Sequence, residues 1–322
     1  MVKIPRVIPR GRQTSHRGTD NFSPADLQHR SRTLLSCAFA DNTKKLYNVG
    51  LHKFNTFRST FKHNIIWPPT TQQLVQFIAY LSLHQYSATT VKSYLAGISF
   101  YCKMSSTPDT TQSFVVKKSL MGYSRFMVPV DKRKPITLDI LHKLLNTLPL
   151  VCSLPYEVNL FSAVFTTAFF GYFRMGELVQ NSCRELGHAI QVQDVRITSA
   201  NSVQILLKHS KTDQMGKGMI INLSSTSRDI CPVKSLKSYI GVRPCVPGSF
   251  FCHAGGAPVT RYQVSSVFSM LITKLGLQTR DYKTHSFRIG AATEAWFQGK
   301  DIDQIAEAGR WKSKCLYRYI RA

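Results

Sequence analysis

The feature that most constrains the fold of this chain is its longest apolar run, Val158 to Phe173, which leads directly into Arg174. The run has 16 residues and is interrupted by Ser and Thr, whereas a membrane-spanning helix needs about 20 apolar residues. We therefore expect a helix buried inside a globular domain. An unpaired charge at the end of such a helix is costly, so Arg174 is predicted to meet a buried acidic side chain or a bound phosphate.

The charge of the chain indicates a polyanionic partner. Lys and Arg number 42 against 17 Asp and Glu, a net charge of +25. Residues 1–135 carry 20 basic and 5 acidic side chains, and residues 136–322 carry 22 and 12. An excess in both halves suits a clamp around a nucleic-acid duplex better than a ligand that touches one module. The alternative is a basic, solvated surface of the kind that RNA-binding proteins have.

The eight cysteines form no C-x-x-C pair, and the cluster of Cys245, Cys252 and His253 lacks zinc-site spacing. We interpret them as reduced thiols of a cytosolic or nuclear protein, and we expect neither a metal site nor a cofactor. Residues 1–12 have no apolar core of the kind that a secretory signal needs. No association with a membrane is expected.

The first half of the chain reads as a flexible arm followed by a helical domain. Residues 1–34 are rich in Arg, Pro and Ser and predict a basic arm that grips phosphates, carries a nuclear-import signal or is only a tail. Residues 35–125 show helical patterning, with a capping-box signature at Thr70 to Gln73. The apolar positions expected to face inward are Leu46, Gly50, Phe54, Phe57, Leu74, Phe77, Ile78, Leu81, Val91, Leu95 and Ile98.

The second half reads as a larger, mostly helical domain. Residues 126–135 contain Pro and four charges and predict an exposed linker. Residues 136–322 begin with a helix start at Thr137 and contain one clear strand pair, 203–207 and 219–223, around the polar turn 208–218. The expected fold class is therefore mainly α with a small antiparallel β-sheet in the second domain.

Three short motifs carry residue types that suit attack on a phosphodiester without a metal. The pattern G-x-x-R-x-x-E-L spans residues 171–178, H-x-x-R spans 285–288, and Trp311 follows His285 by 26 residues. Tyr319 lies three residues from Ala322, and Lys211 lies in the polar turn. Arginine binds phosphate through two parallel hydrogen bonds and keeps its charge.

The order and spacing of these motifs resemble the tyrosine recombinase family, which includes phage integrases and the recombinases of Crypton- and DIRS-like mobile elements. In that family the tyrosine usually lies nine residues after the His or Trp. Here Tyr319 lies eight residues after Trp311, and Tyr317 is the other candidate. The resemblance implies a DNA clamp with a helical core-binding domain and a catalytic domain.

The resemblance also implies a role for each motif residue. Two arginines would flank the scissile phosphate, a histidine and an indole N–H would bind it, a lysine would protonate the leaving 5′-oxygen, and a tyrosine would form a 3′-phosphotyrosyl intermediate. A glutamate would orient an arginine or the histidine. The two arginines are Arg174 and Arg288, the histidine is His285, and the indole is that of Trp311. The lysine is Lys211, with Lys208 and Lys217 as competitors. The tyrosine is Tyr319, and the glutamate is Glu177.

Side chains outside the motifs are expected to contact the DNA backbone. Each could equally be ordinary surface. The candidates in the helical domain are Lys44, Lys45, Thr89, Thr90, Lys92 and Tyr94, and those in the linker are Arg133 and Lys134.

The resulting hypothesis is a recombinase or integrase of a transposable element that acts on duplex DNA as a homo-tetramer, with no small-molecule substrate. We expect it in the nucleus if the source is eukaryotic and otherwise in the cytoplasm. Many family members continue after the tyrosine into a helix that docks on a neighbour, whereas Tyr319 lies three residues from Ala322. The alternative is therefore a recombinase-derived DNA-binding protein without strand exchange. Two further alternatives are a nicking and closing activity like that of a topoisomerase, and a basic RNA-binding protein.

Overall fold

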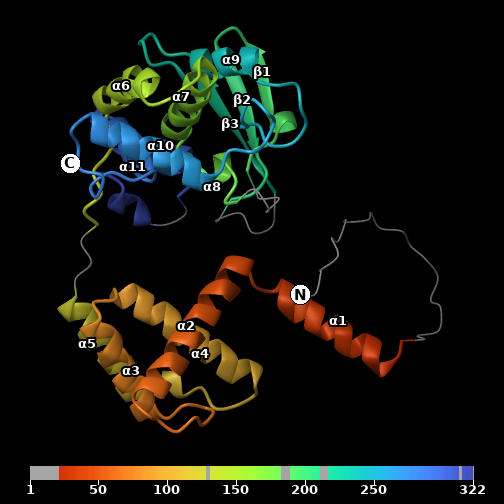
Figure 1. Ribbon diagram of the computed structural model, residues 1–322, viewed down its shortest axis with the longest axis vertical. Helices are drawn as coiled ribbons and strands as arrows, with labels where there is room; N and C mark the ends of the chain where they lie inside the picture. The colour runs from red at the N-terminus through yellow and green to blue at the C-terminus, as the bar shows by residue number, and fades with distance from the viewer. Residues whose placement is uncertain (1–21, 128–130, 183–188, 211–216, 312–313, 322) are drawn as a thin grey trace. The chain divides into compact units, whose positions relative to one another are not determined.

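The computed structural model describes residues 22–127, 131–182, 189–210, 217–311 and 314–321. The chain divides into two compact units, Met1–Val130 and Asp131–Ala322, and the division falls inside the segment 126–135 that the sequence analysis assigns to a linker. The fold is mainly helical with one small antiparallel sheet, so the predicted fold class is confirmed (Figure 1).

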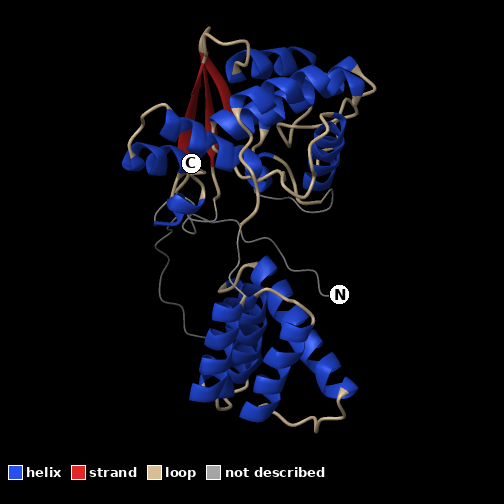
Figure 2. Cartoon of the chain, turned by 90° about the vertical axis from the view of Figure 1, so that its left-hand side faces the viewer, coloured by secondary structure: helices blue, strands red, loops and turns tan. Residues whose placement is uncertain are grey.

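The described part of the first unit contains helices and loops but no strand (Figure 2). Ser23 caps α1 through a capping box with Asp26, and Pro24 occupies the first turn, where a missing N–H costs nothing. The prediction of a flexible arm over residues 1–34 is therefore wrong for residues 24–34, and residues 1–21 lie outside the described range. The elements are α1 Pro24–Cys37, α2 Asp41–Thr60, α3 Thr71–Leu83, α4 Ala88–Met104, the 3₁₀ turn η1 Thr110–Gln112 and α5 Phe114–Phe126.

The predicted start and inner face of α3 are confirmed. Thr70 accepts a hydrogen bond from the main-chain N–H of Gln73, whose side chain accepts one from the N–H of Thr70. Its inward positions Leu74, Phe77, Ile78 and Leu81 are all buried. Leu46 of α2, which we expected to be inward, is 40% exposed, because the neighbouring Tyr47 takes the inner position and packs on Phe100 of α4.

Helices α2 and α4 cross closely at two glycines. A Cβ atom on Gly50 would lie 2.8 Å from Cα of Tyr94, and one on Gly97 would lie 2.9 Å from Cα of Tyr47. This crossing buries Tyr94, which is 8% exposed. The prediction that Tyr94 faces partly outward to contact DNA is therefore wrong: its ring belongs to the core, 6.0 Å from that of Tyr86.

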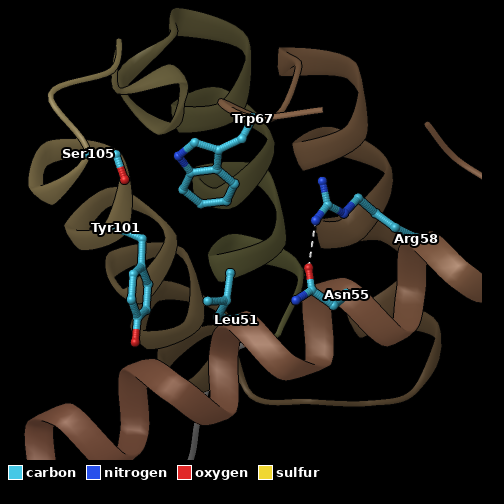
Figure 3. A pocket seen from close by; sticks show the side chains of 6 residues that line it. All are labelled: Leu51, Asn55, Arg58, Trp67, Tyr101 and Ser105. Carbon is cyan, nitrogen blue, oxygen red and sulfur yellow. Dashed lines mark hydrogen bonds between the residues drawn. The ribbon is translucent and has the colours of Figure 1, made fainter. Parts of the chain in front are cut away.

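An open pocket lies in the first unit beside α2 (Figure 3). Arg58 is 4% exposed and donates hydrogen bonds to Asn55 Oδ1 at 2.6 Å and to the carbonyl oxygen of Ile66 at 2.9 Å. The guanidinium thus ties α2 to the loop that precedes α3. The lining residues are Leu51, Asn55, Arg58, Trp67, Tyr101 and Ser105.

The second unit combines helices with a three-stranded antiparallel sheet of order β1-β2-β3. Strands β2 and β3 confirm the predicted pair, and β1 is an additional strand (Figure 1). The helices are α6 Leu138–Thr147, α7 Pro155–Phe170, α8 Met175–Leu178, α9 Pro232–Val242, α10 Arg261–Lys274, α11 Ser286–Phe297 and α12 Ile302–Gly309. The strands are β1 Val195–Ser199, β2 Ser202–Leu207 and β3 Met219–Ser224, and the 3₁₀ turns are η2 Leu148–Leu150, η3 Val192–Asp194 and η4 Lys314–Arg318.

The core of this unit is built around α7, which confirms the helix expected from the apolar run. Residues 163–169 of α7 are all buried. The ring of Phe165 stacks on that of Phe287 of α11, with centroids 5.1 Å apart. This contact sets α11, which begins just after His285, against the helix that leads to Arg174.

The start of the second unit runs against α11. The N–H of Ile136 donates to the carbonyl oxygen of Ser286 at 3.1 Å, and the N–H of Lys134 donates to that of Asp281 at 2.8 Å. A Cβ atom on Gly290 would lie only 1.9 Å from the carbonyl oxygen of Ile136. Residues 134–136 are therefore anchored to the second unit.

Among the described residues, no helix is both long and apolar enough to cross a membrane. The same residues contain no group of His, Cys, Asp and Glu side chains that could hold a metal ion.

Candidate active site

Arg174 is positioned by a turn at the end of α7. The helix stops at Phe170, and Tyr172 adopts φ 50°, a left-handed conformation that redirects the chain. Arg174 then precedes the short helix α8, where its N–H donates to Glu177 Oε2 at 2.9 Å and its Nη1 donates to Glu177 Oε1 at 2.8 Å. The side chain of Arg174 is 24% exposed, whereas that of Glu177 is 7% exposed. The buried partner of Arg174 is thus an acidic side chain, and part of its guanidinium faces outward.

Arg288 lies in the first turn of α11 and is completely buried. Its two Nη atoms donate hydrogen bonds to the carbonyl oxygens of Tyr172 and Gly309, and its Nε has no partner among the described residues. The guanidinium carbon lies 4.3 Å from the ring centroid of Trp311. Burial, with the positive charges of Arg174 and Arg310, lowers the pKa of Arg288.

Trp311 and Tyr319 lie on the same side of Arg288. Their ring centroids are 4.7 Å apart, and that of Tyr319 is 5.7 Å from the guanidinium carbon of Arg288. Trp311 is 7% exposed, and its indole N–H finds no acceptor in the described part of the chain. Thr293 of α11 holds the terminal segment, because its hydroxyl donates to the carbonyl oxygen of Tyr319 at 3.2 Å and accepts from the N–H of Arg321 at 3.1 Å.

His285 faces the ring of Tyr319, with centroids 5.2 Å apart. Burial lowers its pKa to about 4, and the positive charges of Arg133, Arg288 and Arg174 act in the same direction. The imidazole is therefore neutral near pH 7, with a nitrogen lone pair available to accept a proton.

The segment before α6 adds charges beside this histidine. Asp131 holds Arg133 through two hydrogen bonds, of 2.8 and 2.9 Å, and also accepts from Arg321 at 3.0 Å. Hydrogen bonds from Arg133 lower the pKa of Asp131 to about 2. Arg133, predicted to contact the DNA backbone, thus lies close enough to His285 to affect its pKa.

A third arginine joins the cluster that the motifs predicted. Arg310 is 7% exposed and donates from Nη2 to Glu177 Oε2 at 3.1 Å, so one carboxylate is shared by Arg174 and Arg310. Arg310 is not among the residues predicted from the motifs. The signal that could have found it is spacing, because Arg310 lies nine residues before Tyr319, the distance that the resemblance gives to the His or Trp.

The structure thus brings five of the six predicted catalytic residues into one cluster, and it brings Glu177 with them. Lys211 lies outside the described residues. Of its two competitors, Lys208 follows β2 and its Nζ lies 2.5 Å from Asp194 Oδ1, whereas Lys217 is exposed. Tyr317, the other candidate nucleophile, is 60% exposed. The members of the cluster are Arg174, Glu177, His285, Arg288, Trp311 and Tyr319.

The residues predicted to contact DNA are at least partly exposed, apart from the buried Tyr94. Lys45, Thr89 and Lys92 are exposed, and Lys44 and Thr90 are half-buried. Lys44 pairs with Asp41 at 3.2 Å, and Thr90 shares a hydrogen bond with Ser87 at the start of α4. Lys134, also a candidate, pairs with Asp281 at 3.1 Å while its side chain stays 59% exposed. Their contacts with DNA stay predictions.

The fold is similar to solved structures of recombinases and integrases. A lambda integrase dimer bound to a COC′ core site matches with a TM-score of 0.63 and 15% identity, over 92% of this chain and 94% of that one. The Tn1549 transposon integrase in complex with transposon right end DNA matches with 0.62 and 12%, over 92% and 93%. The XerH site-specific recombinase bound to its difH substrate matches with 0.61 and 16%, over 86% and 75%. No protein-family profile and no curated protein matches the chain, and at these identities the likeness establishes the fold.

Proposed function

We propose that this chain, which has the fold of the tyrosine recombinases, is itself such an enzyme and cleaves and rejoins duplex DNA through a 3′-phosphotyrosyl intermediate on Tyr319. The observation that carries this proposal is the convergence of Arg288 and Trp311 beside the ring of Tyr319, with Arg174 close enough to Arg288 to lower its pKa. These side chains come from separate parts of the chain, and together they present cationic and N–H donors next to a phenol.

The charge of the cluster favours an anionic ligand. Three guanidinium groups, those of Arg174, Arg288 and Arg310, share the single carboxylate of Glu177 or lie next to it. Buried charges are costly unless a counter-charge compensates them. A phosphate diester would supply the missing negative charge.

The unpaired donors point to the same ligand. Buried N–H groups are normally hydrogen-bonded, and leaving one unpaired costs about 1–3 kcal/mol. The Nε of Arg288 and the Nε1 of Trp311 are both buried and find no partner among the described residues, and Trp311 packs on the Arg288 guanidinium. Phosphate oxygens can accept from both.

The proposed reaction uses each residue at a defined atom. The phenol oxygen of Tyr319 attacks phosphorus while its proton passes to the neutral His285, and the bond from phosphorus to the 5′-oxygen breaks. Arg174 and Arg288 stabilise the charge that develops on the non-bridging oxygens. The leaving 5′-oxygen takes a proton from the lysine of the β2–β3 turn, for which Lys211 is proposed, and such general acid assistance is worth about 10²- to 10⁴-fold in rate.

The DNA partner and the assembly belong to the same proposal. A net charge of +25 suits a duplex, and the similar solved structures include integrases and a recombinase bound to DNA. Strand exchange needs several copies, for which we propose a homo-tetramer. Helix α1 offers an apolar face for a second copy, because Leu27, Leu34 and Leu35 are each at least half exposed and the last two follow Leu27 by seven and eight residues.

The test is formation of a covalent protein–DNA adduct. Duplexes that the protein selects from a random pool are rebuilt with a nick near the bound site, so that the cleaved end diffuses away and the adduct accumulates. Wild-type protein should yield an SDS-resistant complex, and Tyr319→Phe should abolish it. Tyr317→Phe is the matched control, since Tyr317 is exposed two residues away, and it should retain the adduct.

Three outcomes would overturn parts of the proposal. Loss of the adduct in Tyr317→Phe but not in Tyr319→Phe would move the nucleophile. Tight DNA binding without any adduct would favour a recombinase-derived DNA-binding protein. Stronger competition by RNA than by DNA would favour an RNA-binding protein.

A further inference from the structure

Arg310 occupies a backbone position that disfavours its residue type. It follows α12 directly and adopts φ 61° and ψ 40°, the left-handed region in which helices most often end with glycine. A side chain with a Cβ is strained in this conformation. An arginine is therefore stable here because the contacts of its side chain offset the strain.

Those contacts are with the turn that carries Arg174. The Nη1 of Arg310 donates to the carbonyl oxygen of Gly171 at 3.0 Å, and its Nη2 donates to that of Tyr172 at 2.9 Å and to Glu177 Oε2 at 3.1 Å. The guanidinium carbon also lies 5.1 Å from the ring centroid of Phe173. One side chain thus binds three successive residues of the turn and the carboxylate that closes it.

Two of these acceptors are shared with the arginines of the phosphate site. Glu177 binds Arg174 through its other oxygen, at 2.8 Å, and the carbonyl oxygen of Tyr172 also accepts from Arg288. The residue before Arg310, Gly309, supplies the second acceptor of Arg288. The segment 309–310 therefore connects the turn of Arg174 to the helix of Arg288.

Both Nη atoms of Arg310 are occupied by protein acceptors. Arg310 is 7% exposed, and only its Nε, like that of Arg288, finds no partner among the described residues. Arg174 is the most exposed of the three arginines, with 24% of its side chain accessible. The hydrogen bonds of Arg310 to Glu177 and to the turn are therefore the contacts through which it can act on the phosphate site.

We propose that Arg310 is a positioning residue, which fixes the directions of the Arg174 and Arg288 guanidinium groups by sharing Glu177 and the Tyr172 carbonyl oxygen with them. This inference rests on the proposed function. Without Arg310, Glu177 loses one of its two cations and the turn loses two hydrogen bonds, so Arg174 is no longer held at one angle. A displacement of about 1 Å can cost about 100-fold in rate.

The activity test compares three variants in single-turnover adduct formation at increasing DNA concentration. Arg310→Met removes the charge and the donors, and Arg310→Gly does the same while relieving the strained backbone. The control is Arg243→Met, because Arg243 also binds main-chain carbonyl oxygens within the second unit, at residues 244, 246, 249 and 250. Both Arg310 variants should lower the maximal rate about 100-fold and leave the half-saturating DNA concentration within about twofold, whereas Arg243→Met should change neither.

A second measurement does not depend on activity. The side-chain Nε–Hε signals of Arg174 and Arg288 are followed by NMR in wild-type protein and in the same variants. Both signals should shift or broaden in Arg310→Gly and stay unchanged in Arg243→Met. Unchanged signals in Arg310→Gly, or a rate equal to that of wild type, would overturn the positioning role. Absence of an adduct in wild-type protein would count against the proposed function, and the NMR comparison would still decide the role of Arg310.

Discussion

The buried histidine of the site makes the stability of the second unit depend on pH. The pKa of His285 falls from 6.5 to about 4 on folding, chiefly because burial disfavours the charged imidazole. Between pH 6.5 and 4 the unfolded chain therefore binds more protons than the folded one, and stability falls as the pH falls. For these two values the loss between pH 7 and pH 4.5 is about 2 kcal/mol.

The assay is urea unfolding at pH 7 and pH 4.5, with wild-type protein and His285→Gln compared. Both carry Trp67→Phe, so that the remaining tryptophans, Trp296 and Trp311, report on the second unit alone. Glutamine does not titrate, so the free energy of unfolding should fall by about 2 kcal/mol more in wild-type protein than in the variant. Asp131, which faces the same histidine, has a pKa of about 2 and stays ionised at both pH values.

Equal losses in the two proteins would refute the reasoning, because they would mean that His285 is already protonated near pH 6 in the folded protein. The same result would weaken its proposed role, since a protonated imidazole has no lone pair to accept the proton of Tyr319. A larger loss in the variant than in wild-type protein would have the same meaning.

Three further predictions concern packing, chemistry and DNA binding. In urea unfolding, Gly290→Ala should destabilise the second unit by about 3 kcal/mol or more, because the added Cβ would lie 1.9 Å from the carbonyl oxygen of Ile136. The control is Gly241→Ala, which should be neutral or stabilising because nothing lies within 4 Å of the added Cβ. Arg174→Lys should lower the single-turnover rate about 10²- to 10³-fold at unchanged DNA affinity, since lysine lacks the planar pair of donors, and a rate near that of wild type would contradict this. DNA affinity measured by fluorescence anisotropy should fall about 10³-fold or more between 50 and 200 mM salt if six or more phosphates are contacted, whereas a flat dependence would exclude the clamp.

Elements with strong local signals could be predicted from the sequence. The capping box at Thr70 sets the start of α3, and the long apolar run sets α7, because both signals act within one or two helical turns. The capping box of Ser23 and Asp26 was an equally local signal. The composition of residues 1–34 masks it, because a content rich in Arg, Pro and Ser favours disorder.

Features that depend on distant packing could not be predicted. Strand β1 alternates apolar and polar residues over only five positions and is mostly exposed, so its pairing with β2 decides its conformation. Tyr94 has polar neighbours in the sequence and was expected at the surface, but the close crossing of α2 and α4 at Gly50 and Gly97 buries it. In both cases the deciding contact comes from another element.

The residues of the candidate site could be predicted from the motifs, because each motif combines particular residue types at a fixed spacing along the chain. Their hydrogen-bond partners were not. Arg310 binds Glu177 across 133 positions of sequence, and Arg288 binds the carbonyl oxygen of Tyr172 across 116. Only packing of α11 and α12 against the end of α7 selects these acceptors. Buried guanidinium groups donate to the oxygen atoms that the tertiary structure places within hydrogen-bond distance, and local sequence patterns do not predict which atoms these are.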